Sequence, residues 1–349
     1  MKINIGDMNM KNINILRLGF LSIMFLFLFT SLSAKNEVVI ATIGMTKPSF
    51  SKGMEAQEMV DRMINVFKGE LGRVLSYKPD LIVLPEGCDH PTDLSREEKA
   101  NYFKVRKNQI FDYFASVAKE NNCYIAYGTT RDADDGYRYN SLVVIDRTGK
   151  QAGVYNKNFL TIGEMESGLR PGTDAPLIQC DFGTIAGAIC FDLNFDELLE
   201  KYEKSQPDII VFPTMYHGGL VQSKWAYASR SFFVSSGGNR DIPSEIRNPL
   251  GEIVASSTNY FRYTVGTVNL DSKLAHLDYN WGKLTKLKEK YGPDVTITDP
   301  GKLGSVLITS EHETITADQM IKEFEIELLD DYMKRSRDFR NNKLGLVKN

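Results

Sequence analysis

The sequence predicts an α/β protein in which two mixed β-sheets are faced by helices. Short apolar runs typical of buried strands alternate along the chain with longer stretches of helical periodicity. Two of these runs, residues 80–86 and 208–214, are near copies of each other, which indicates a repeated strand–helix unit. With 349 residues, 42% of them hydrophobic and 25% charged, the chain suits one large globular domain.

The first half of the chain alternates strands with helices. Residues 55–75 carry apolar side chains on one helical face, and residues 140–156 read as a hairpin that turns at 147–150. In order we expect a strand at 38–43, a helix at 55–75, a strand at 80–86, a helix at about 96–120, a strand at 123–128 and the hairpin at 140–156.

The second half repeats this theme. We expect a strand at 183–190 that breaks into a helix, a strand at 208–214, a helix near 224–230, and strands at 232–236, 244–248 and 265–270. Near the end of the chain, Thr316 and Gln319 form a capping box that opens an amphipathic helix, with its apolar stripe running from Ile321 to Tyr332.

Cys190 is the residue that points most directly to chemistry. It ends a run of small and apolar residues and is followed at once by an acidic, helix-favouring segment. The N–H groups at a helix N-terminus lower the pKa of a thiol and can receive an oxyanion. We therefore expect a nucleophile at Cys190.

Four further side chains stand at strand ends or just after them. Glu86 closes the run 80–86, where open α/β sheets place their active sites, and Thr214 occupies the matching position of the second run. Lys157 lies at the end of the second strand of the hairpin and is followed by Glu164. One carboxylate, one ammonium and one thiol on neighbouring strand ends would form an asymmetric site.

These segments resemble the motifs of the carbon–nitrogen hydrolase (nitrilase) superfamily. The three motifs read Leu81-Ile-Val-Leu-Pro-Glu86, Tyr155-Asn-Lys157-Asn-Phe-Leu and Gly187-Ala-Ile-Cys190-Phe-Asp. They occur in the family's order, and the similarity runs over about residues 38–271. Asn194 and Asp196 depart from the family's pattern, which commonly has Arg and Pro at these positions.

The resemblance implies a four-layer α-β-β-α sandwich and an amide hydrolase that uses a Cys190 thioester. Glu86 would act as general base and acid, while Lys157 and the backbone N–H of Phe191 would stabilise the oxyanion. Glu164 would orient Lys157 or the substrate, with Glu166 as the rival for that role. No cofactor is implied.

The loop after Thr214 lines the pocket in family members, so Tyr216 and His217 are candidate substrate-binding residues. Trp225 fits a packing role better. The substrate class is a small amide, a nitrile or a carbamoyl compound, with amides ranked first. An acyltransferase using the same acyl-enzyme, or an inactive binding protein that keeps the fold, stays open as an alternative.

The N-terminus predicts export. Basic residues precede an apolar run at 18–30, and small residues at 31–34 close it, which is the order of a secretory signal. Cleavage after Ser33 or Ala34 would leave no membrane anchor and a periplasmic or secreted protein. The domains would then be a leader at 1–34, a hydrolase domain at 35–272 and an extension at 273–349 whose helix docks on its own domain or joins subunits in a homo-oligomer.

Composition and cysteine usage exclude other classes. The net charge is −3 with Lys and Arg spread along the chain, so no nucleic-acid partner is indicated. The four His residues show no ligand spacing, which argues against a metal site. If Cys190 stays free, at most one disulfide can form among Cys88, Cys123 and Cys180, and free thiols are favoured.

Overall fold

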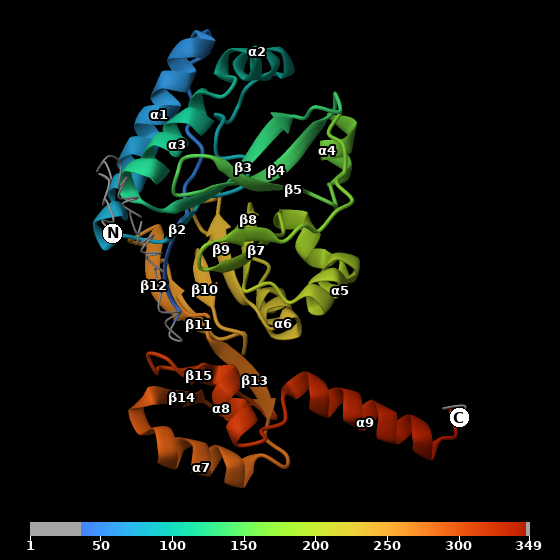
Figure 1. Ribbon diagram of the computed structural model, residues 1–349. Coiled ribbons are helices and arrows are strands. Elements are labelled where there is room, and N and C mark those ends of the chain that lie inside the picture. The colour runs from blue at the N-terminus through green and yellow to red at the C-terminus, as the bar shows by residue number, and fades with distance from the viewer. Residues whose placement is uncertain (1–35, 347–349) are drawn as a thin grey trace, which may run out of the picture. The chain divides into compact units, whose positions relative to one another are not determined.

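The computed structural model describes residues 36–346 and contains two six-stranded sheets and one three-stranded sheet (Figure 1). The predicted leader at 1–34 lies outside the described residues. Within the part of the chain that is described, no helix combines the length and apolar character that crossing a membrane requires.

The first sheet has the strand order β12-β1-β2-β3-β4-β5. β1 pairs in parallel with β2 and β2 with β3, while the remaining pairs are antiparallel. Its strands are β1 (Glu37–Ile43), β2 (Leu81–Val83), β3 (Tyr124–Asp132), β4 (Arg138–Ile145), β5 (Gln151–Asn156) and β12 (Tyr263–Asn269).

The second sheet has the order β11-β10-β9-β8-β7-β6, with β7, β8 and β9 parallel. Its strands are β6 (Ile178–Cys180), β7 (Gly183–Gly187), β8 (Ile209–Thr214), β9 (Phe232–Gly237), β10 (Glu245–Arg247) and β11 (Ile253–Ser256). Both sheets are mixed, as predicted.

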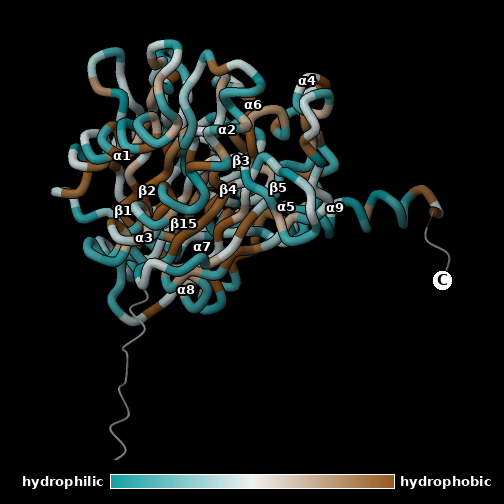
Figure 2. Tube along the Cα trace, turned by 90° about the horizontal axis from the view of Figure 1, so that it is seen from above, coloured by the Kyte–Doolittle hydropathy of each residue, from teal (hydrophilic) through white to brown (hydrophobic). Residues whose placement is uncertain are grey.

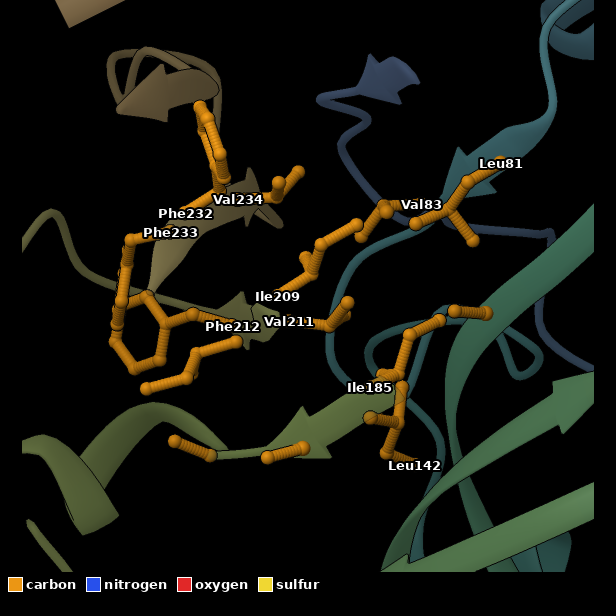
Figure 3. Packing of buried hydrophobic residues seen from close by; sticks show 14 of the residues in the cluster. Leu81, Val83, Leu142, Ile185, Ile209, Val211, Phe212, Phe232, Phe233 and Val234 are labelled. Carbon is orange, nitrogen blue, oxygen red and sulfur yellow. The ribbon is translucent and has the colours of Figure 1, made fainter. Parts of the chain in front are cut away.

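Alternation along β2 shows how the layers form. Leu81 and Val83 pack between the sheets with Ile185 and Val211 (Figure 3). Ile82 belongs instead to the apolar cluster on the opposite face, with the helices. Successive strand side chains point to opposite faces, so a strand that is apolar throughout is buried on both.

Helices cover the two outer faces. The outer face of the first sheet packs on α1 (Ala56–Gly72), α2 (Arg96–Arg106) and α3 (Gln109–Asn121). The other packs on α5 (Asp196–Ser205) and α6 (Leu220–Ser229). The predicted four-layer α-β-β-α order is confirmed.

Two predicted helices are each divided in the structure. The helix expected at 96–120 is α2 followed by α3, because Lys107 adopts a φ of 41° that no α-helix accommodates. The helix opened by Thr316 ends early as α8 (Ala317–Glu323), and after Glu325, with a φ of 52°, α9 (Leu329–Lys343) begins. The capping box itself is present.

The C-terminal region forms a small α/β unit that the sequence analysis did not anticipate. Its sheet has the order β13-β15-β14 and packs on α7 and α8 around a core of its own. The elements are β13 (Ser272–His276), α7 (Trp281–Tyr291), β14 (Val295–Thr298) and β15 (Ser305–Ser310). Helix α9 buries one residue, Leu329, and is mostly hydrophilic along its length (Figure 2).

Candidate active site

Glu86 is held at the carboxyl end of β2 by a close backbone approach. The turn after the strand lies against Gly128 of β3, where an added Cβ would stand 2.6 Å from the Glu86 Cα and 2.7 Å from the Pro85 oxygen. Real Cβ contacts are not that short, so only glycine fits here. Glu86 itself is buried, as expected of a carboxylate at this sheet edge.

Lys157 joins the two carboxylates that the sequence analysis singled out. Its Nζ lies 2.9 Å from Glu86 Oε1 and 2.9 Å from Glu164 Oε2. The Lys157 side chain is only 1% exposed. Its backbone N–H donates to the Asn140 oxygen at 2.8 Å, which extends the β4–β5 pairing at the open end of the hairpin.

Glu164 is positioned by the short helix α4 (Ile162–Glu166). Thr161 caps this helix, and the Thr161 N–H donates to Glu164 Oε2 at 2.8 Å in a capping box. The amide of Asn140 donates to Glu86 Oε1 and to Glu164 Oε1, both at 2.8 Å. Asn140 and Lys157 therefore bridge the same two carboxylates.

The charges of this network support one another. Burial alone would lower the pKa of Lys157, but the carboxylates of Glu86 and Glu164 outweigh burial and raise it. Burial alone would raise the pKa of Glu164, but Lys157, Asn140 and the Thr161 amide outweigh it and lower the pKa. The ammonium form of Lys157 is thus strongly favoured.

Cys190 lies in the same pocket, which has a volume of about 480 Å³ and is lined also by Glu86, Lys157 and Glu164. It begins the 3₁₀ helix η2 (Cys190–Asn194) and has a φ of 46°, a conformation that costs free energy outside glycine. Backbone strain of this kind is often found at active sites.

The expectation of a lowered thiol pKa is wrong for the resting protein. Burial and the Glu86 charge raise the pKa of Cys190 to about 12, and Lys157 and the Met215 N–H lower it only in part. The segment after Cys190 starts as a 3₁₀ helix of five residues, and α5 begins only at Asp196, so no α-helix N-terminus stands directly at the sulfur. Cys190 is a thiol beside a carboxylate.

Asp192 anchors the turn from within the core. Its carboxylate accepts hydrogen bonds from the Ile189 N–H at 2.8 Å, the Phe159 N–H at 2.7 Å and the Tyr155 hydroxyl at 2.7 Å. These bonds tie the Cys190 turn to the segment after Lys157. Burial raises the pKa of Asp192 to about 6, against the effect of these hydrogen bonds.

The remaining predicted site residues lie around this centre. The Phe191 ring packs edge-on against Phe195, with ring centroids 5.2 Å apart. Glu166 is exposed and does not line the pocket, so of the two rivals it is Glu164 that contacts Lys157.

Tyr216 and His217 are placed outside the pocket lining. The Tyr216 hydroxyl accepts from the Asn194 amide at 3.2 Å, and His217 Nε2 lies 3.2 Å from Glu245 Oε2. Trp225 is fully buried and donates to the Leu193 oxygen at 3.1 Å, which confirms its packing role. All four cysteines are free.

The fold and this geometry agree with a match to a known family. Residues 39–276 match the model of the carbon-nitrogen hydrolase family. The chain belongs to the carbon-nitrogen hydrolase family. This assignment confirms the resemblance and accounts for the two mixed sheets. The family match ends at residue 276, the last residue of β13.

The curated relatives are distant. The chain is 24% identical to human pantetheinase over 260 residues, which is 64% of this chain and 50% of the relative. It is 25% identical to the omega-amidase NIT2 of Homo sapiens over 51% of this chain and 72% of the relative. The chain thus spans about half the length of the pantetheinase that it matches.

Solved structures of other carbon-nitrogen hydrolases share the fold. An amidase from Nesterenkonia sp. AN1, with the acetamide moiety of fluoroacetamide covalently added at its active-site cysteine, superposes with a TM-score of 0.57 at 14% identity, covering 74% of this chain and 97% of that chain. Nit3 of Saccharomyces cerevisiae gives a TM-score of 0.56 at 15% identity, covering 76% and 97%.

Two residues of the site escaped the sequence analysis. Asp192 is part of the Cys190 motif. Acidic residues are common directly before a helix, so its role as a buried anchor of the turn was not recognised. Asn140 begins a predicted strand and carried no motif, since its contacts to Glu86 and Glu164 are made across the fold.

Proposed function

We propose that this carbon-nitrogen hydrolase cleaves the C–N bond of a small amide through a thioester on Cys190. The observation that carries the proposal is the placement of Cys190 in one pocket with the Glu86–Lys157–Glu164 network. A thiol, a neighbouring base and a fixed cation are the parts that acyl transfer to a cysteine requires.

In the first half-reaction, the sulfur of Cys190 attacks the amide carbon while its proton passes to Glu86. The oxyanion that forms would be stabilised by the Lys157 ammonium and the backbone N–H of Phe191. Glu86 then delivers the proton to the departing nitrogen, the C–N bond breaks, and ammonia or an amine leaves with the acyl group retained on sulfur.

In the second half-reaction, Glu86 takes a proton from water, which attacks the thioester carbon. The carbon–sulfur bond breaks, the thiol regains its proton, and a carboxylic acid leaves. Glu164 acts through Lys157, because both of its carboxylate oxygens accept hydrogen bonds from the ammonium and hold it in place. One carboxylate thus serves both half-reactions.

The names of relatives support an amide as substrate. Among the matched proteins are an omega-amidase, a pantetheinase and amidases. The adduct at the active-site cysteine of the Nesterenkonia amidase supports a nucleophilic role for Cys190.

Trapping the acyl-enzyme tests the proposal. Glu86→Gln keeps the shape of the side chain but removes the base, so turnover of small amides should fall at least ~100-fold while the thioester accumulates. Intact mass spectrometry during incubation should show an added acyl mass that hydroxylamine removes.

Cys190→Ala is the matched control and should carry no adduct. An added amine that accelerates loss of the adduct and appears in the product would identify a transferase instead. Well-folded protein that neither turns over nor forms an adduct with any amide, nitrile or carbamoyl compound would contradict the proposed function.

A further inference from the structure

Two lysines outside the catalytic network line the same pocket. Lys47 lies in the loop after β1, and Lys99 lies in the first turns of α2. Both are half-buried, and neither forms an ion pair with any of residues 36–346. Lys99 Nζ lies 5.7 Å from the centroid of the Phe103 ring, a contact that leaves its N–H groups available.

Neighbouring cations are neutralised, in contrast to this pair. Arg138 Nε lies 2.6 Å from Asp132 Oδ1, and Arg106 pairs with the buried Asp89. Lys157 is shared between two carboxylates. Three lysines and two glutamates line the pocket, so its side chains carry one net positive formal charge. Without Lys47 and Lys99 the lining would carry one net negative charge.

Lys99 lies in surroundings that oppose its charge. Burial and the charge of Lys47 lower the pKa of Lys99, and Asp89 and Glu164 offset this effect only in part. An anion close to both side chains would relieve this repulsion and supply the missing counter-charge.

The space for such an anion is open because residue 87 is glycine. A Cβ at Gly87, which has a φ of 51°, would lie 3.2 Å from Lys47 Nζ and 3.2 Å from His90 Nε2. His90 adds no charge there. Its Nδ1 donates to the Pro91 oxygen at 3.0 Å, which leaves Nε2 as an acceptor, and burial together with Lys47 and Lys99 lowers the His90 pKa.

We infer that the substrate is a small amide that also carries a carboxylate, and that Lys47 and Lys99 bind this carboxylate while Cys190 attacks the amide carbon. The inference rests on the proposed function. One net positive charge matches a carboxylate, whereas a phosphate monoester carries close to two negative charges at neutral pH. A pocket of about 480 Å³ suits a small molecule.

The test compares succinamate with succinamide, its neutral isostere, on full-length Cys190→Ala protein by calorimetry. Succinamate should bind at least ~10-fold more tightly, because hydrogen bonds to charged groups are worth more than neutral ones. The preference should shrink as ionic strength rises. Adding Lys47→Met or Lys99→Met should remove most of it, with little change for succinamide.

Lys104→Met is the matched control, since Lys104 is on the same helix as Lys99 but is exposed and outside the pocket. Equal affinities for the two compounds, no detectable binding of succinamate, or an equal loss in the Lys104→Met control would overturn the inference. If amides are hydrolysed with no preference for the charged compound, the inference fails and the proposed function stands. If succinamate binds through both lysines but no amide is ever turned over by the native protein, the anion site stands and the proposed function fails.

Discussion

Cys190 keeps its proton in the resting protein, since the pKa of its thiol is raised to about 12. The nucleophilic thiolate therefore forms only during the reaction, when the thiol proton passes to Glu86 as the sulfur attacks the substrate. This arrangement leaves little free thiolate, the reactive form, on the half-buried Cys190 between turnovers.

Alkylation of Cys190 should follow this pKa. In Glu86→Gln the base and its charge are absent, but burial still raises the pKa of Cys190. The rate of labelling by iodoacetamide should therefore rise ~10-fold per pH unit from pH 7 to 9, as the thiolate fraction does below the pKa. Peptide mass mapping in the native protein should find Cys190 labelled before Cys88, Cys123 and Cys180. A rate that levels off within this range would mean a preformed thiolate.

Glu164 should contribute to the free energy of unfolding in a way that depends on pH. Its pKa is lowered from 4.5 in the folded protein, so the ionised form stabilises the fold above about pH 4.5 and this contribution is lost as the pH falls through the folded value. Glu164→Gln should therefore be less stable than the native protein at pH 7, with the difference shrinking towards pH 3.

Urea unfolding across this pH range measures the effect. Glu166→Gln, an exposed neighbour on the same helix, is the control and should show no such pH dependence. A difference between native and Glu164→Gln protein that stays constant down to pH 3 would contradict the assignment of the pKa shift to Lys157.

How far the site could be predicted depended on the kind of contact. Glu86, Lys157 and Cys190 stand in local motifs at strand ends, and a sheet brings strand ends together, so their convergence followed from the sequence. The bridging amide of Asn140 could not be predicted, because its position opposite Lys157 depends on the register of the β4–β5 hairpin. The raised pKa of Cys190 depends on burial, which local sequence does not reveal.

At the scale of elements, the turn after β2 depends on its neighbour β3. Gly128 lets the backbone of Glu86 lie against the strand, so the catalytic carboxylate is placed by an element distant in sequence. The hairpin and most strands of the two large sheets were predicted from period and turn residues, but the pairing of the strands was not. The helix breaks at Lys107 and Glu325 were not predicted. Both residues have a positive φ, but neither is a glycine or a proline, so the local sequence does not mark the end of a helix.

Gly128→Ala should therefore damage the site from outside it. The added methyl would have to move Glu86, and a displacement of ~1 Å at a reacting group costs ~100-fold in rate. We expect turnover to fall by about this factor and the free energy of unfolding to fall by ~1–3 kcal/mol, as for other overpacked positions.

Gly69→Ala is the matched control. Gly69 lies within α1 with nothing within 4 Å of its added Cβ, so alanine should stabilise the helix by up to ~1 kcal/mol and leave turnover unchanged. Full activity in Gly128→Ala would show that the turn after β2 tolerates movement. Steady-state kinetics and urea unfolding of both variants provide the comparison.

At the scale of the whole molecule, the two mixed sheets were predictable because strands and helices alternate over 38–270. The small sheet of β13, β14 and β15 was not, since β14 has only four residues and no motif draws attention to it. Its core is separate from the core between the large sheets.

We also propose that the protein is exported and loses its leader. The mature chain recovered from its native cell should begin at Ala34 or Lys35, as N-terminal sequencing or mass spectrometry would show. Such cleavage would leave the described residues intact, since they begin with Asn36, whose N–H donates to Asn269 Oδ1 at 3.1 Å. Recovery of a cytosolic protein that begins at Met1 would refute the proposal.

The pairing of β1 with β12 sets an order of events in biogenesis. Glu37 lies opposite Asn269 and Ile43 opposite Tyr263, so β1, the first strand of residues 36–346, is synthesised well before β12, the strand that closes its edge. Until then the apolar strand β1 exposes an open edge, which other chains can pair with. A chain released early would be prone to aggregate, and a chain threaded across a membrane from its N-terminus could close its first sheet only after residue 269 had crossed.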